Sequence, residues 1–176
     1  RERQSALVAR LGGERRSLTQ AAGSLAEKER KLSSFLDLLV GRNPNGPAGS
    51  SIQRFRGVLD WPVRGRVTAP FGPRLDPRYR TTVPHNGIDL ETREGDDVVA
   101  IYAGKVLYAA PFAGYGWTVV VQHPGQVLSL YAGLSELKVG AGDGVSLGQS
   151  VGLASGSLYF EVRVENRPEN PVSWLR

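Results

Sequence analysis

The stretch DVVAIYAGKVLYAAP (residues 97–111) decides the fold class of this chain. It is dense in Val, Ile, Leu and Tyr, is broken at Gly104 and ends at Pro111, a composition that favours short strands closed by turns. Comparable runs lie on both sides of it: GRVTAPFG (65–72), GIDLET (87–92), WTVVVQHPG (117–125), VLSLYAG (127–133) and LYFEVRVEN (158–166). No helical periodicity separates these runs, so the sequence predicts an antiparallel β domain and not a βαβ fold.

The first 40 residues follow a different pattern. Leucines recur there at the seven-residue spacing of a coiled-coil seam: Leu11, Leu18, Leu25, Leu32 and Leu39. The residues between them alternate in charge, as in EKERK (27–31), which suits a solvated face. Two interpretations are open: a long amphipathic helix that lies on its own domain, or the end of a coiled coil whose partner strand is missing from this fragment. The strict heptad favours the second.

The stretch GRNPNGPAGSS (41–51) has the Gly, Pro, Asn and Ser content of a linker. We therefore expect a mainly β fold with an N-terminal α-helical coiled-coil segment. The expected parts are a coiled-coil helix over residues 1–40, a linker over 41–57 and a β domain over 58–176.

Composition sets further bounds. The formal net charge is +5, from 22 Lys and Arg against 17 Asp and Glu, and it is spread along the chain, so no nucleic-acid partner is expected. There is no cysteine, which excludes disulfides and thiolate metal sites. No apolar run approaches the roughly 20 residues that span a bilayer. Because the chain opens at Arg1 within a helical pattern, we expect it to be a fragment without its signal sequence.

The chain has two histidines, His85 and His123, and the first precedes Asp89 by four residues. In a flat strand the side chains of His85 and Asp89 would share a face but lie about 13 Å apart. Gly87 could bend the chain and let them converge. From the residues alone, the pair is either half of a metal site or a histidine and an aspartate that hydrogen-bond their own loop, and a lone H-x-x-x-D favours the loop.

Segment by segment, residues 60–176 resemble the LytM/lysostaphin-type zinc metallopeptidases that cut peptidoglycan cross-links. The resemblance rests on motifs in family order: FGPRLDP (71–77), HNGIDL (85–90), YAGLS (131–135) and SLYFEVR (157–163). In active members of that family, the histidine and aspartate of H-x-x-x-D bind zinc. The resemblance therefore places His85 and Asp89 on two ligand positions.

The same resemblance implies that the rest of the zinc site has been lost. The third ligand of active members is the second histidine of an H-x-H segment, and Tyr159 stands there. The two histidines that assist catalysis are replaced by Gly133 and Ser157. A neutral tyrosine is a poor zinc ligand, serine is no general base near neutral pH, and two ligands should not hold zinc firmly. We therefore expect no cofactor and no catalytic residue, with His85 and Asp89 as vestiges, and give His123 little weight as the third ligand of a rewired site.

Together with the helix and linker, DWPVRG (60–65) and NPVSWLR (170–176) resemble the EnvC-type murein hydrolase activators. Such proteins are periplasmic in Gram-negative cells; their degenerate LytM domain switches on N-acetylmuramyl-L-alanine amidases at the division septum, and their coiled coil engages the FtsEX complex. A helical arm can cover the groove in that family. One departure is that degenerate activators often lose the His and Asp that this chain retains.

A groove that no longer hydrolyses can serve as a docking surface, in which Tyr and Arg are favoured. The residues expected to line or rim it are His85, Asn86, Asp89, Tyr131, Ser157, Tyr159 and Arg163. By strand parity, Tyr159, Glu161 and Arg163 should face one side of the sheet. The expected function is non-catalytic amidase activation, with peptidoglycan as a possible further partner. The alternatives are an active zinc endopeptidase with an unrecognised third ligand and a passive peptidoglycan-binding module.

Overall fold

A computed structural model describes residues 2–76 and 80–176; for residues 2–9, 18, 19, 21, 22 and 76 it describes the backbone alone. The elements, in chain order, are α1 (Glu2–Arg42), η1 (Ile52–Phe55), β1 (Arg66–Ala69), β2 (Arg74–Asp76), β3 (Thr81–Val83), β4 (Ile88–Val99), β5 (Gly104–Phe112), β6 (Gly116–His123), β7 (Val127–Leu137), β8 (Gly144–Val145), β9 (Ser150–Val164), β10 (Arg167–Glu169) and η2 (Pro171–Trp174).

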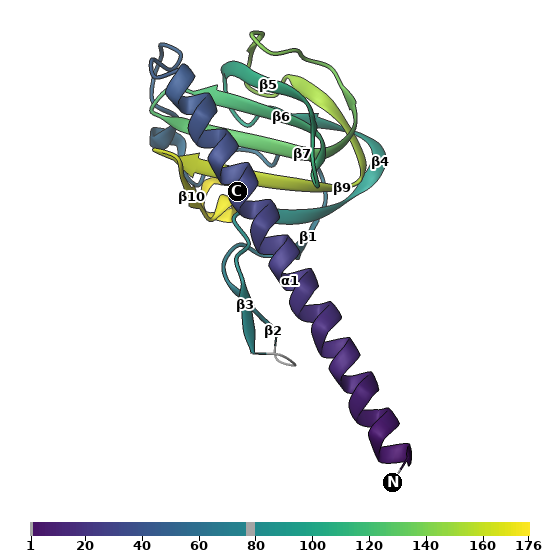
Figure 1. The fold of residues 1–176 in the computed structure, drawn as a ribbon. Helices are drawn as coiled ribbons and strands as arrows, with labels where there is room; N and C mark the ends of the chain where they lie inside the picture. The colour runs from purple at the N-terminus through teal and green to yellow at the C-terminus, as the bar shows by residue number, and fades with distance from the viewer. Residues whose placement is uncertain (1, 77–79) are drawn as a thin grey trace.

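One antiparallel sheet dominates the molecule, which confirms the predicted fold class. Its strand order is β1-β4-β9-β7-β6-β5-β8, and β10 pairs with β9 outside this path (Figure 1). Strands β2 and β3 form a separate small hairpin. The longest strands, β4 and β9, lie side by side with Asp89 opposite Tyr159. Two positions that the sequence separates by 70 residues are thus brought together by strand pairing.

The two faces of the sheet pack against different partners. Alternate side chains of β4, β7 and β9, such as Ile88, Tyr131 and Phe160, enter the main hydrophobic core. The other face presents a smaller apolar cluster, including Val120 and Leu130, to helix α1. Because side chains alternate along each strand, one face of the sheet packs into the main core and the other is covered by α1.

Helix α1 lies on its own domain over its C-terminal half. Leu32 and Leu36 are fully buried against the sheet, and Leu39 packs beside them. Toward the N-terminus the helix extends beyond the domain, and Leu11 is 56% exposed (Figure 1). The first interpretation, a helix that lies on its own domain, therefore applies to the second half of α1, although the heptad spacing favoured a coiled coil. The reason is that an apolar face of the sheet is available to bury its leucines. The side chain of Leu18 lies outside the described residues, and a coiled coil over residues 1–40 stays a prediction.

Helix α1 ends at Arg42, where Asn43 donates from its backbone N to the carbonyl of Val40 and from Nδ2 to that of Leu39, both at 3.0 Å. Pro44 follows and cannot continue the helix. The expected linker is shorter than 41–57, since Ile52 is fully buried in the main core. The Ile52 backbone N also donates to the Pro124 carbonyl at 3.1 Å.

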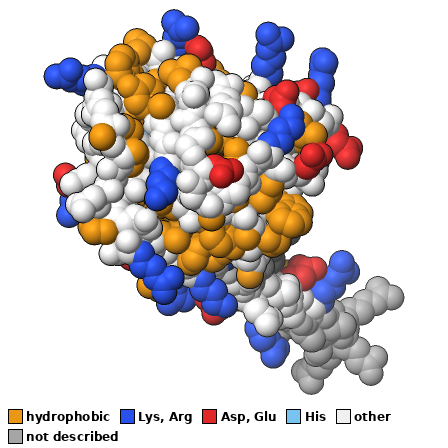
Figure 2. Space-filling model, turned by 90° about the horizontal axis from the view of Figure 1, so that it is seen from above, with side chains coloured by type: hydrophobic (Ala, Val, Ile, Leu, Met, Phe, Trp, Pro, Cys, Tyr) orange, Lys and Arg blue, Asp and Glu red, His pale blue; other side chains and the backbone are white. Residues whose placement is uncertain are grey.

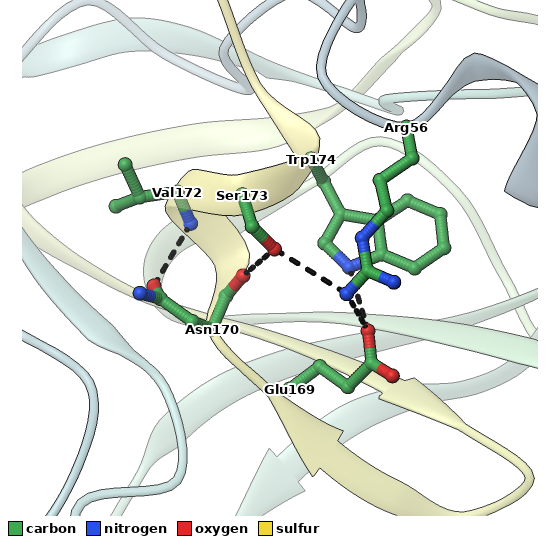
Figure 3. Close-up of polar contacts among 6 residues, drawn as sticks. All are labelled: Arg56, Glu169, Asn170, Val172, Ser173 and Trp174. Carbon is green, nitrogen blue, oxygen red and sulfur yellow. Dashed lines mark hydrogen bonds and ion pairs between the residues drawn. The ribbon is translucent and has the colours of Figure 1, made fainter.

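The segment that follows η1 contacts the C-terminal residues of the chain (Figure 3). Arg56 forms an ion pair with Glu169 and lies over the ring of the buried Trp174, 4.9 Å from its centroid. Trp174 Nε1 donates to the same Glu169 carboxylate at 3.2 Å. The backbone of Leu59 pairs with that of Leu175. Residues 52–60 therefore belong to the β domain.

Basic side chains are dispersed over the face shown in Figure 2, while hydrophobic side chains gather in a patch beside the projecting helix. Phe35 contacts Tyr108 and Phe112 where α1 meets β5, with ring centroids 4.8 and 5.0 Å apart. Within the described part of the chain, no helix is long and apolar enough to cross a membrane.

Candidate functional site: a cavity beneath helix α1

A cavity of about 260 Å³ lies between α1 and the sheet. Strands β4, β7 and β9 contribute to its floor, and the β2–β3 hairpin contributes Arg74 and Val83 to its wall. All five positions that the sequence assigned to the dismantled zinc site line this cavity: His85, Asp89, Gly133, Ser157 and Tyr159. Tertiary structure therefore assembles the predicted site in one place.

His85 and Asp89 converge although they are four residues apart. His85 lies just before β4, and its Nε2 is 3.4 Å from Asp89 Oδ2. Its Nδ1 donates to the Pro70 carbonyl at 2.8 Å, which leaves Nε2 toward the carboxylate. The hydrogen bond to Asp89 raises the pKa of His85 above its usual 6.5. The role of Gly87 is close packing: a Cβ there would lie 2.4 Å from the Phe160 carbonyl oxygen of β9.

Tyr159, which stands at the third ligand position, is already hydrogen-bonded to another residue of its strand. The Tyr159 hydroxyl donates to Glu161 Oε2 at 2.7 Å, and burial raises the pKa of this phenol, so Tyr159 stays neutral. Gly133 takes φ +81° at a bulge in β7 and has no side chain to offer. Across residues 2–76 and 80–176, the described side chains contain no group of three or more His, Cys, Asp or Glu placed to hold a metal ion.

Glu161 and Arg163 form a buried ion pair on the helix-facing side of β9. Their exposed fractions are 1% and 3%, and Arg163 Nε donates to the Glu161 carboxylate. Burial raises the pKa of Glu161. Tyr159, Glu161 and Arg163 share one face, as parity predicted. However, Arg163 does not rim an open groove: its Nη2 donates to the Ser33 hydroxyl of α1 at 2.9 Å.

Helix α1 covers the cavity and makes a polar contact with it through Glu29. Glu29 is buried, and its Oε2 accepts a hydrogen bond from Asn86 Nδ2 at 2.9 Å. Burial raises the pKa of Glu29. Lys28 Nζ lies 4.1 Å from the centroid of the Tyr115 ring. The sequence predicted a solvated face for EKERK (27–31) and did not assign these contacts to Glu29 or Tyr115; Glu29 is buried because α1 lies on the sheet.

One predicted groove residue, Tyr131, and the second histidine, His123, lie elsewhere. Tyr131 does not line the groove, because it points into the main core, is fully buried and accepts a hydrogen bond from the Ile101 backbone N at 3.0 Å. His123 lies on that same side: Nδ1 donates to the Ala103 carbonyl at 2.8 Å, and Nε2 accepts from the Ser129 hydroxyl at 2.7 Å. Ser129 Oγ is 2.9 Å from the Tyr131 hydroxyl. His123 therefore cannot join His85 at a metal ion.

The antiparallel sheet and the converging His85–Asp89 pair are features that the resemblance to LytM-type domains predicted. The chain belongs to peptidase family M23, whose model matches residues 83–171. That match contains His85, Asp89, Gly133, Ser157 and Tyr159 and excludes α1.

Comparison with curated proteins finds relatives of two kinds. The chain is 35% identical over 127 residues to the murein hydrolase activator EnvC of Escherichia coli, an alignment covering 68% of this chain and 29% of EnvC. It is 30% identical over 122 residues to the activator NlpD of the same species, covering 65% of this chain and 30% of NlpD. It is also 35% identical over 117 residues to the DD-carboxypeptidase/endopeptidase Mpg of Neisseria meningitidis, covering 63% of this chain and 27% of Mpg.

The chain thus spans less than a third of the length of each of these relatives. Among solved structures, Csd3 of Helicobacter pylori superposes with a TM-score of 0.62 at 29% identity, covering 69% of this chain and 35% of Csd3. Lysostaphin has the same fold, with a TM-score of 0.56 at 23% identity over 66% of this chain and 52% of that chain.

Proposed function

We propose that this chain is a non-catalytic activator of cell-wall amidases that cleave N-acetylmuramyl-L-alanine bonds during septal splitting in the periplasm. The observation that carries the proposal is that Tyr159 stands at the third ligand position and donates a hydrogen bond from its hydroxyl to Glu161. The similarity to EnvC and NlpD, both murein hydrolase activators by name, supports it.

The chemistry of the remaining residues favours a pseudoenzyme that has lost zinc. A catalytic zinc site needs three protein ligands and an open position for water. Here His85 and Asp89 supply two, and Tyr159 would have to ionise in a buried site that raises its pKa. Gly133 and Ser157 supply no general base near neutral pH. Residues relieved of catalysis are available to bind a partner.

Helix α1 is the element that would regulate access in this proposal. It occupies the groove through Glu29, Leu32 and Ser33, so an amidase could use the groove only after α1 has moved. The part of α1 that extends beyond the domain is where an FtsEX-like complex would act through a coiled coil. The closed structure is then the inactive state of the activator.

A dye-release assay on labelled cell walls tests the proposal, with a cognate amidase present or absent. We expect no release by this chain alone and stimulated release when the amidase is present. Tyr159→Ala should reduce stimulation, while Leu147→Ala, which changes an exposed side chain outside the cavity, should not. Release by this chain alone without stimulation would reverse the assignment.

The second candidate function is an active zinc endopeptidase. The retained contact of 3.4 Å between His85 and Asp89 favours it, as does the similarity to Mpg, a peptidase by name. Metal analysis of protein purified without chelator separates the two candidates. Stoichiometric zinc that is lost in His85→Ala would support the enzyme, and an activator predicts neither.

A further inference from the structure

A second cavity, of about 460 Å³, lies at the C-terminal end of α1. Among the described residues, none lines both this cavity and the one beneath α1. Its walls come from four segments: the last turn of α1, the linker over residues 44–47, the turn between β6 and β7, and the turn between β9 and β10. We call it the hinge cavity, because α1 would have to bend away from the β domain at this point in order to move.

Hydrogen bonds hold these segments together. Gln122 is buried, and its Nε2 donates to the Asn43 carbonyl at 2.9 Å, which ties the start of the linker to β6. The Glu165 backbone N donates to the Gln126 carbonyl at 2.9 Å, which joins the two turns. The hinge cavity is therefore preformed in the closed state, as binding sites for small molecules usually are.

The charge of the hinge cavity is opposite to that of the chain. The chain carries 22 Lys and Arg, yet none of those that the structure describes lines this cavity, and Glu165 is its one charged lining residue. Glu165 is exposed, and among the described side chains it forms no ion pair. A carboxylate without a cationic partner attracts a positively charged ligand.

Two further groups favour the same sign of charge in a ligand. Val40 and Gly41 belong to the last turn of α1, where the carbonyl groups carry partial negative charge. Asn166 also lines the cavity, and its Oδ1 is buried without a hydrogen-bond partner among the described residues. Such an acceptor costs free energy, and rotation of the Asn166 amide would present it to a bound donor. The cavity therefore selects a ligand that is both a cation and a hydrogen-bond donor.

The rest of the lining favours an organic cation over a metal ion. A cation such as Ca²⁺ takes about six to eight oxygen ligands, and Glu165 is the one carboxylate here among the described residues. Val40, Pro44, Pro47 and Leu128 supply apolar surface, and the volume lies in the range of small-molecule sites. An ammonium group on an aliphatic stem fits both parts, because the stem covers apolar surface while the charged end meets the acceptors.

We propose that the hinge cavity is a binding site for an aliphatic amine, with the ammonium group at Glu165 and at the C-terminal carbonyls of α1, and the stem along Val40 and Leu128. Such a ligand touches α1, the linker and the β domain at once. It therefore binds the closed state more tightly than a state from which α1 has moved away. If the open state does not bind it, the ligand at ten times its Kd favours the closed state by roughly tenfold.

The regulatory meaning of this site rests on the proposed function. If release of α1 opens the groove to an amidase, an amine in the hinge cavity opposes that release from the C-terminal end of the helix. The coupling would be allosteric, because the hinge cavity and the cavity beneath α1 are two distinct sites that report on the same movement. Binding of the amine itself does not depend on any amidase.

NMR titration of the isotopically labelled 176-residue chain tests the site with four probes: hexylamine, 1-hexanol, ammonium chloride and Nα-acetyl-lysine methylamide. We expect hexylamine to shift the backbone signals of residues 40–46, 125–128 and 165–166. Hexanol has a similar stem without the charge and should bind roughly fivefold more weakly. Ammonium has the charge without the stem and should give no saturable shift. The lysine derivative should bind more weakly than hexylamine, because its two amides would meet apolar walls.

Two variants locate the amine. Glu165→Gln keeps the shape of the side chain and removes its charge, so it should weaken hexylamine binding roughly fivefold. Asn166→Gly should also weaken binding while keeping the turn, because glycine readily adopts the φ of +62° found at this position. Glu136→Gln changes an exposed carboxylate of β7 outside the cavity and is the matched control, with binding like that of the wild type.

Hydrogen exchange gives the second measurement: hexylamine should slow exchange of the α1 backbone amides over residues 32–42 in the wild type and not in Glu165→Gln. Absence of hexylamine binding, equal binding of hexanol, shifts that gather at the cavity beneath α1, or unchanged binding by Glu165→Gln would each overturn the proposal. Tighter binding of the lysine derivative would overturn the assignment to a free amine. Amidase stimulation without amine binding defeats this inference alone, whereas amine binding without stimulation defeats the proposed function alone.

Discussion

Arg163 is a buried charge that joins the helix-covered face of the sheet to α1. It lies between Glu161 of its own strand and Ser33 of α1, and it is 3% exposed. A buried ion pair adds little net stability when intact, yet removal of one partner leaves an uncompensated charge. Arg163 therefore neutralises the buried Glu161, and its charge is not free to pair with a carboxylate of a partner protein.

We expect Arg163→Met to lower the free energy of unfolding by about 3–5 kcal/mol, because Glu161 would stay buried with only Tyr159 as a donor. Urea unfolding measures the loss, and the exposed Arg167→Met is the control. Arg163→Glu should be worse, since it places two carboxylates together. Stimulation lost in Arg163→Glu would therefore report unfolding and not docking, and near-native stability of Arg163→Met would contradict the description of the pair.

His123 predicts a pH dependence of stability. Burial lowers its pKa to about 4 from its usual 6.5, so the folded protein binds fewer protons than the unfolded chain between these values. Stability is present above pH 6.5 and falls as the pH drops toward 4, by about 3 kcal/mol in total. NMR titration of the His123 ring checks the pKa, and His85, which should titrate above 6.5, is the internal reference. A His123 signal that titrates near 6.5 in the folded state would show the prediction to be wrong.

At the scale of elements, α1 is held to the sheet by the buried Leu32 and Leu36, by Phe35 and other apolar side chains beside them, and by a few polar contacts. Leu32 and Leu36 are buried, whereas Leu38 on the opposite side of the helix is 58% exposed. The same helix thus offers docking residues and a matched control. Its neighbours on the sheet, Val120 and Leu130, would lose their cover if it moved.

Leu32→Asp should release α1, because burying a carboxylate among apolar side chains costs several kcal/mol. Under the proposed function, the released groove should stimulate the amidase more strongly than the wild type, while Leu38→Asp should behave like the wild type. Hydrogen exchange of α1 confirms release, and dye release measures stimulation. Leu32→Ala is the milder variant, with an expected cost of about 2–5 kcal/mol in helix docking. Unchanged stimulation despite fast exchange in α1 would mean that the groove is not the docking surface.

At the scale of the whole molecule, the β domain is closed by segments from far apart in the sequence. Ile52 enters the main core just after the linker, and Arg56 joins Glu169 and Trp174 near the C-terminus. The glycine-rich stretch therefore ends where the domain begins, and motion of α1 can occur without loss of this closure.

Ile52→Ala should destabilise the whole domain by about 2–5 kcal/mol, because it leaves a cavity in the main core. Val58→Ala, at a position that is 55% exposed, should change stability little. Thermal unfolding of the full chain measures both. Equal midpoints for the two variants would indicate that the domain begins after residue 57, as the sequence alone suggested.

The sequence by itself determined the β class and the helix, and it named five positions that lie together in one cavity, since these depend on local composition, on spacing and on motifs in a fixed order. His85, Asp89, Gly133, Ser157 and Tyr159 were all identified in this way. Tertiary structure decided what each face of the sheet packs against. It placed Tyr131 in the core and turned the second half of α1 onto the sheet. The physical reason is that burial depends on what lies opposite, and the partner surfaces come from strands distant in the sequence.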